Sequence, residues 1–148
     1  MTARYYVGLF NQELYRNGIE VSPIQFLPVV MVTLLEHNNQ ASSIVYNVEP
    51  FMEGDFKKLT NNWDWVEKEG AGSKLVLAFS HFTFERSNHT LLITDHQGWT
   101  TEDHLSTTFL TDPQIHSFDK TLYGTVCSKR QDYHQEPLIG IQPGKCEN

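Results

Sequence analysis

Two aspartates and a glutamine are the residues of this chain whose types and spacing best suit chemistry on a phosphate. Asp95 and Gln97 follow a short apolar run at residues 91–94, and Asp112 stands directly before Pro113. Carboxylate and amide oxygens are ligands that suit Mg²⁺, which phosphoryl-transfer sites hold with one or two carboxylates and the substrate phosphates. A carboxylate beside such a metal can also orient a hydroxyl nucleophile and accept its proton. These side chains are therefore candidates for a phosphoryl-transfer site.

The expected strand and turn geometry is compatible with a shared site for Asp95, Gln97 and Asp112, but it does not require one. If the strand from residue 91 continues to Gly98, Asp95 and Gln97 point to one side, because strand side chains alternate with a period of two. Gly98 would then let the backbone turn away, and Pro113 would rigidify the turn that carries Asp112. The alternative is that both aspartates are solvent-facing turn residues bonded to their own backbone, which is the commoner role on residue type alone.

The elements that must position these residues predict a mixed α+β domain. One helical face of Tyr6, Leu9, Phe10 and Leu14 predicts a helix that ends at Gly18. Residues 24–35 are apolar and β-branched, which predicts a buried strand with a bend or an edge position at Pro28. Residues 43–49 predict a second, antiparallel strand that ends before Pro50.

The second half of the chain is expected to contain a further helix and a short strand. Residues 60–72 are polar and rich in turn residues, which predicts a loop. The apolar spacing of Leu75, Ala78, Phe79 and Phe82 predicts a helix over residues 75–86. Residues 91–94 predict a strand with Asp95 at its end, and the chain from residue 132 onward gives no assignable pattern.

Composition limits the class of protein. The chain has 148 residues, 39% of them hydrophobic and 12% aromatic, which suits one globular domain. Its formal net charge is −7, which argues against a nucleic-acid or anionic-membrane partner. The first ten residues lack the pattern of a signal peptide, and no apolar stretch is long enough to span a bilayer. We therefore expect a cytoplasmic protein in which Cys127 and Cys146 are reduced.

Several segments, taken in order, resemble the alpha-type protein kinases, the family of the myosin heavy chain kinases and elongation factor kinases. Residues 46–56 are similar to the hinge of that family, which cradles adenine, and Asn61-Asn62 resembles the remnant of its asparagine-rich loop. Three further segments match motifs of its C-terminal lobe: Ala78-Phe79-Ser80-His81, Asp95-His96-Gln97-Gly98 and Thr111-Asp112-Pro113. The resemblance covers roughly residues 10–116.

The resemblance implies a protein-kinase-like α+β fold, with residues 1–148 as one partial domain made mostly of the C-terminal lobe and the hinge. It implies ATP and Mg²⁺ as cofactors and transfer of the γ-phosphoryl group to Ser or Thr of a protein substrate that the sequence does not identify. Asp95 would be the catalytic aspartate, and Gln97 and Asp112 would serve the metal and phosphates. Glu49 and Met52 would line the adenine pocket.

The family's zinc site is expected to be incomplete. The resemblance makes His81 one zinc ligand and Cys146 another, but Gly144 occupies the position of the family's histidine, and the last cysteine is absent. A structural zinc requires four ligands, so we expect no Zn²⁺ here. His81, on an apolar helix face, is instead expected to be a buried, hydrogen-bonded core residue.

Two departures leave other functions open. The strands that carry the family's nucleotide-anchoring lysine, and its late glycine-rich segment, have no recognisable counterpart, and Lys57-Lys58 is expected to be a solvated surface pair. One alternative is therefore a catalytically degenerate kinase lobe that acts as a binding or scaffold module. Another is a metal-dependent hydrolase that uses Asp95, Asp112 and the histidines at 96 and 116, although the segment at 49–56 has no role in it.

Overall fold

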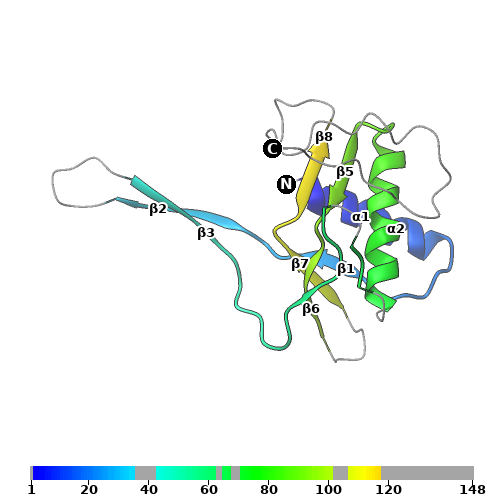
Figure 1. The fold of residues 1–148 in the computed structure, drawn as a ribbon, viewed down its shortest axis with the longest axis horizontal. Helices are drawn as coiled ribbons and strands as arrows, with labels where there is room; N and C mark the ends of the chain where they lie inside the picture. The colour runs from blue at the N-terminus through cyan, green and yellow to red at the C-terminus, as the bar shows by residue number, and fades with distance from the viewer. Residues whose placement is uncertain (1, 36–42, 63–64, 68–70, 102–106, 118–148) are drawn as a thin grey trace.

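The computed structural model describes residues 2–35, 43–62, 65–67, 71–101 and 107–117, and shows the mixed α+β fold that the sequence predicts (Figure 1). The predicted tail beyond residue 132 lies outside the described residues. In chain order the elements are α1 (Thr2–Arg16), β1 (Ile24–Phe26), β2 (Val30–Leu35), β3 (Ser43–Val48), β4 (Lys57–Lys58), α2 (Ala71–Arg86), β5 (Leu91–Thr94), β6 (Gln97–Thr100), β7 (Thr108–Thr111) and β8 (Gln114–Ser117).

Helix α1 is longer than predicted but ends where the sequence indicates. Gly18, at a φ of 65°, provides the left-handed residue after the last turn. The amides of Gly18 and Ile19 donate to the carbonyls of Tyr15 and Leu14, at 3.1 and 3.0 Å, which is the Schellman pattern of helix termination.

Helix α2 begins at Ala71, inside the segment predicted as a loop. Its buried face contains Val76, Phe79 and Thr83, each fully buried, whereas Ala78 is exposed. The buried face of α2 is therefore rotated by part of a turn from the face that the sequence predicted. Residues 60–62 and 65–67 of the predicted loop are irregular except for an isolated bridge between Thr60 and Val66.

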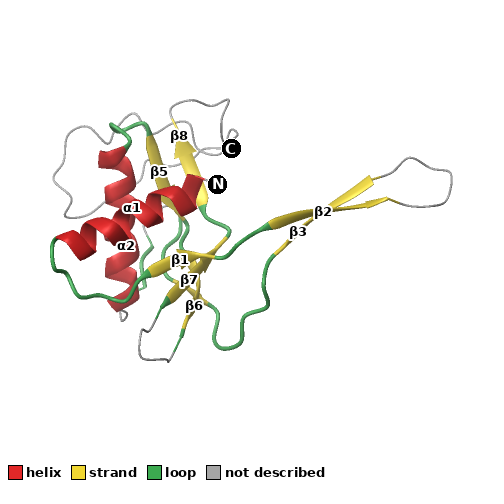
Figure 2. Ribbon diagram, turned by 180° about the vertical axis from the view of Figure 1, so that it is seen from behind, coloured by secondary structure: helices red, strands yellow, loops and turns green. Residues whose placement is uncertain are grey.

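The core lies where the two helices meet the strands. Phe10 of α1 packs against Phe79 and Phe82 of α2, with ring centroids 5.5 and 5.4 Å apart. Strands β1, β5 and β7 supply apolar side chains with no exposed surface, namely Ile24, Ile93 and Leu110. Figure 2 shows both helices beside these strands. This body holds the candidate site.

Two sheets of the body continue into each other through short breaks. One has the order β1-β7-β6-β4, in which β1 runs parallel to β7 and the other pairs are antiparallel. The other is the antiparallel pair β5–β8. Because β5 leads into β6 and β7 leads into β8, the two antiparallel pairs form one interrupted ribbon.

Strands β2 and β3 form a hairpin that projects from the body (Figure 1). The single strand predicted over residues 24–35 is wrong in two respects. It divides into β1 and β2, with Pro28 in the connection, and its second half is not buried. Val30 is 59% exposed and Met31 73%, and Val45 and Tyr46 of β3 are exposed as well. The hairpin therefore presents apolar side chains to solvent.

Candidate active site

The two candidate aspartates lie opposite each other at the break in the ribbon. On one side of the break Thr94 pairs with Gln114, and on the other Gln97 pairs with Thr111. The two-residue connection 95–96 therefore faces the connection 112–113. The prediction of a strand over residues 91–94 with Asp95 at its end is confirmed. Because β6 begins only at Gln97, the strand does not continue to Gly98, so the condition under which Asp95 and Gln97 would point to one side is not met.

Both aspartates adopt left-handed backbone conformations, with φ values of 60° at Asp95 and 45° at Asp112. A non-glycine residue in this region costs about 1–3 kcal/mol, although Asp tolerates it better than most residues. Each aspartate thus marks a sharp change in strand direction. Such strain persists only where the surrounding structure holds it, and it clusters at functional sites.

Asp95 contacts a lysine that the sequence had suggested was only a surface residue. The Nζ of Lys58 lies 2.9 Å from Oδ1 of Asp95, and the two side chains are 46% and 22% exposed. This is an ion pair by distance, although its angle does not make a hydrogen bond. Oδ1 is buried and accepts no hydrogen bond within the described part of the chain. Lys57 and Lys58 are both exposed, as expected, but Lys58 also pairs with Asp95, which the sequence did not indicate.

Gln97 connects the two sides of the site. It is the register partner of Lys58 on β4 and of Thr111 on β7. Gly98 follows inside β6 at a φ of 156°, and a Cβ atom built there would lie 1.9 Å from the carbonyl oxygen of Phe109. Gly98 is thus required for the close approach of β6 to β7, and not for the turn that we had predicted.

The hinge-like segment reaches the site through Glu49. Thr111 donates a short hydrogen bond from its hydroxyl to Oε2 of Glu49, although the two residues are far apart in sequence. Since Asp112 follows Thr111, this bond brings the predicted adenine segment and the predicted metal carboxylate together. Asp112 is exposed, and Met52 is half-buried in the connection between β3 and β4. The place of Met52 in an adenine pocket stays a prediction.

His96 is the site residue that the sequence did not single out for this role. It is fully buried, its Nε2 lies 2.8 Å from Oγ of Ser80, and its ring packs against Phe79. Burial lowers the pKa of His96 to about 3, and a hydrogen bond with the backbone of Ile93 raises this pKa by a smaller amount than burial lowers it. The ring is therefore neutral near pH 7. A histidine following a motif aspartate could have drawn attention, but nothing in the sequence shows that it points inward.

The remaining histidines do not form a metal site within the described residues. No group of three His, Cys, Asp or Glu side chains there could hold a metal ion. His81 is only half-buried and makes no hydrogen bond in that part of the chain, so its expected core role is wrong, and Cys146 lies outside the described residues. The metal-dependent hydrolase is disfavoured because His96 faces the core and Nε2 of His116 lies 3.1 Å from Oγ1 of Thr94.

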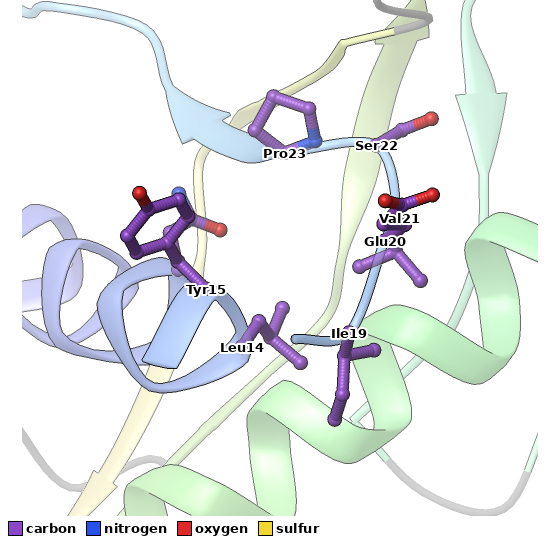
Figure 3. Close-up of a pocket in the computed structure, with 8 residues that line it drawn as sticks. Leu14, Tyr15, Ile19, Glu20, Val21, Ser22 and Pro23 are labelled. Atoms are coloured by element: carbon purple, nitrogen blue, oxygen red, sulfur yellow. The ribbon is translucent and has the colours of Figure 1, made fainter. Parts of the chain in front are cut away.

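A separate depression of about 700 Å³ lies at the end of α1 (Figure 3). Its walls come from the last turns of that helix and from the segment leading to β1, and they include Leu14, Tyr15 and Ile19. None of the candidate site residues lines it. The candidate site is therefore defined by the ribbon break and not by this depression.

The fold is that of an alpha-kinase catalytic domain, of which this chain covers part. The alpha-kinase domain of myosin heavy chain kinase A in complex with AMPPCP matches with a TM-score of 0.64 and 32% identity, over 84% of this chain and 43% of that one. An inactive form of the same domain in complex with ATP matches with a TM-score of 0.65 and 31% identity, over 84% and 44% of the two chains.

Sequence comparison gives the same assignment. Residues 1–135 match the sequence model of a family described as "Alpha-kinase family". Alpha-protein kinase 1 of Homo sapiens is 39% identical over 130 residues, which are 88% of this chain and 10% of that protein. Myosin heavy chain kinase C of Dictyostelium discoideum is 42% identical over 105 residues, which are 71% and 12% of the two chains. The chain belongs to the alpha-kinase family and spans about a tenth of these relatives, and the resemblance drawn from its motifs is confirmed.

No helix in the described ranges is long and apolar enough to cross a membrane.

Proposed function

We propose that this chain is part of a protein kinase catalytic domain that transfers the γ-phosphoryl group of ATP to a serine or threonine hydroxyl of a protein substrate. The observation that carries the proposal is the ribbon break, where Asp95, paired with Lys58, lies opposite Asp112. Family membership and the AMPPCP and ATP complexes of myosin heavy chain kinase A support a site for ATP. We further expect a cytoplasmic protein without nucleic-acid or membrane partners.

Asp95 is the residue placed to orient the substrate hydroxyl and accept its proton. Its Oδ1 is held by the Lys58 ammonium at 2.9 Å, which leaves the other carboxylate oxygen to face the hydroxyl. Lys58 also places a positive charge beside the phosphoryl group that moves. Catalysis of phosphoryl transfer is mostly positioning and charge stabilisation, so one lysine can contribute to both.

The donor atoms around the break fit magnesium. Asp112 offers an exposed carboxylate and Gln97 an amide oxygen, and Mg²⁺ in such sites takes few protein ligands and completes its shell with phosphates and water. When bound, the ion would neutralise negative charge on the phosphates of ATP. Glu49 and Met52 would contact adenine, with Glu49 kept in place by the hydroxyl of Thr111.

A binding or scaffold module without turnover is the alternative. The observation that favours it is the exposed β2–β3 hairpin, since none of the described residues covers its apolar side chains. A phosphate chain held from one side would stay mobile, and much of the positioning effect would be lost. We therefore expect weak ATP binding and little transfer by residues 1–148 alone, and full activity from a longer form with a lysine-bearing lobe.

Transfer of radiolabelled phosphate from ATP, measured on residues 1–148 and on a longer form, tests the proposal. Asp95→Ala should abolish transfer, and Lys58→Ala should lower kcat by about 10- to 100-fold. Lys57→Ala is the matched control, because Lys57 is exposed on the same short strand and pairs with Gly98 instead of Gln97. It should change kcat less than about twofold. Transfer that survives Asp95→Ala, or equal effects of the two lysine variants, would overturn the assignment.

A further inference from the structure

Both the amide and the carbonyl of His96 form hydrogen bonds with the two residues that directly follow β4, the strand that carries Lys58. Its carbonyl accepts hydrogen bonds from the amides of Leu59 and Thr60, at 2.9 and 3.1 Å. Its amide donates to Oγ1 of Thr60 at 3.0 Å. Lys58 directly precedes Leu59, and Asp95 directly precedes His96. The two members of the ion pair are therefore each one residue away from the same set of hydrogen bonds.

The side chain of His96 ties this junction to helix α2. Oγ of Ser80 lies 2.8 Å from Nε2 of His96 and forms a hydrogen bond with it, and Oγ also lies 3.2 Å from the carbonyl oxygen of Val76. The ring centroid also lies 5.5 Å from that of Phe79. Ser80 has only 6% of its surface exposed, and His96 has none. The contact is thus shielded from water.

Packing alone does not explain a histidine at this position. His96 carries two polar ring nitrogens into a site with no exposed surface, and burying them costs free energy that an apolar side chain of similar size would not. An apolar residue would contact Phe79 equally well. It could not form the directional hydrogen bond to Ser80. We infer that this bond fixes the orientation of the ring and, through the ring, the backbone conformation at residues 95–97.

We propose that His96 is a positioning residue, which fixes the Asp95 carboxylate against Lys58 through its bonds to Ser80, Leu59 and Thr60. The left-handed φ of 60° at Asp95 needs such an anchor, because without one the connection would relax to a commoner conformation. His96 has no exposed surface, so it would act on the reaction only through Asp95. Its kinetic effect rests on the proposed function, whereas its effect on the Asp95–Lys58 pair does not.

The kinetic test separates positioning from stability by comparing variants in the longest active form of the kinase. Ser80→Ala and His96→Leu should lower kcat by about 10- to 100-fold with the KM for ATP nearly unchanged, because a displacement near 1 Å can cost a hundredfold. His96→Gln keeps an amide near the position of Nε2 that can form a hydrogen bond with Ser80, and it should restore much of kcat. The double variant of Ser80 and His96 should be no worse than His96→Leu alone.

Phe10→Leu is the control for stability. Phe10 is buried in α1 and packs on Phe79, so its substitution destabilises the same core without touching the junction. It should lower the melting temperature as much as Ser80→Ala does and leave kcat unchanged. If kcat in all these variants simply follows the melting temperature, or if His96→Gln is no better than His96→Leu, His96 has only a structural role.

A second measurement does not depend on catalysis. The ¹³Cγ chemical shift of Asp95 and the side-chain resonances of Lys58 should move in Ser80→Ala and in His96→Leu but not in Phe10→Leu. Unchanged resonances in the first two variants would overturn the positioning role even if the protein transfers no phosphate. Moved resonances in a protein without transfer would keep that role and contradict only the proposed function.

Discussion

The body of the molecule and its β2–β3 hairpin use the same kinds of residues in opposite environments. Ile24 and Ile93 in the body have no exposed surface, whereas Met31 and Val45 in the hairpin are 73% and 55% exposed. The body strands are covered by two helices, and the hairpin is a lone pair of strands (Figure 1). A two-stranded hairpin is at best marginally stable in water. The difference teaches that apolar sequence predicts a strand, but only the rest of the fold decides whether the strand is buried.

The largest difference in stability loss between the two regions should come from replacing a glycine by alanine in each. Gly98→Ala in the body should prevent folding or cost several kcal/mol, because the new Cβ would meet the backbone oxygen of Phe109 at 1.9 Å. Gly54, after the hairpin, also has a left-handed φ of 105°, but nothing lies within 4 Å of its Cβ position. Gly54→Ala should cost only about 1–3 kcal/mol of backbone strain. Urea unfolding of both variants measures the contrast, and equal losses would contradict it.

Large-to-small substitutions should show the next largest difference. Phe79→Ala removes a fully buried ring that touches both helices and β1, and should lower the free energy of unfolding by about 3–5 kcal/mol. Met31→Ala removes a side chain that is mostly in solvent and should change it by less than about 0.5 kcal/mol. A Met31→Ala loss near that of Phe79→Ala would mean that the hairpin is covered in solution.

Lowering the pH should reduce the stability of the body and leave the stability of the hairpin unchanged. His96 in the unfolded chain binds a proton near pH 6.5, but burial keeps the folded protein from binding it until about pH 3. Between these values the unfolded state binds more protons, so stability falls as pH falls, by up to about 1.4 kcal/mol per pH unit. This part of the pH dependence of stability comes from His96 and should be absent in the His96→Gln variant.

The measurement is the difference in unfolding free energy between the natural chain and His96→Gln at pH 6.5 and pH 5. Strands β2 and β3 contain no histidine, so amide exchange there should show no such difference between the two proteins. A constant difference at the two pH values would show that His96 is not kept neutral by burial.

The sequence predicted the elements with strong periodicity and missed the way they are joined. Both helices were found, because their apolar faces repeat along one side. The boundary between β1 and β2 was missed although Pro28 marks it, since a continuous apolar run does not show that its two halves enter different sheets. The parallel pairing of β1 with β7 joins segments about 80 residues apart, and no local pattern encodes it.

At the site, motifs predicted which residues matter but not how they contact one another. Asp95, Gln97, Asp112 and Glu49 were singled out from family motifs, and the structure brings these segments together. The Lys58 ion pair was missed because an exposed pair of lysines is usually a solvated surface. The inward direction of His96 was missed because it depends on a strand break and on the left-handed backbone at Asp95.

The parallel pairing of β1 with β7 also has consequences for how the chain folds. The span that it closes contains the hairpin, the hinge-like segment, α2 and the candidate site residues except Asp112. Closing a loop of this length carries a large entropic cost before any contact compensates for it, so we expect the helices and the β5–β8 pair to form first. Strand β1 would then add last, at the edge of the sheet beyond β7, so the ribbon that carries Asp95 and Asp112 would form before the long loop closes.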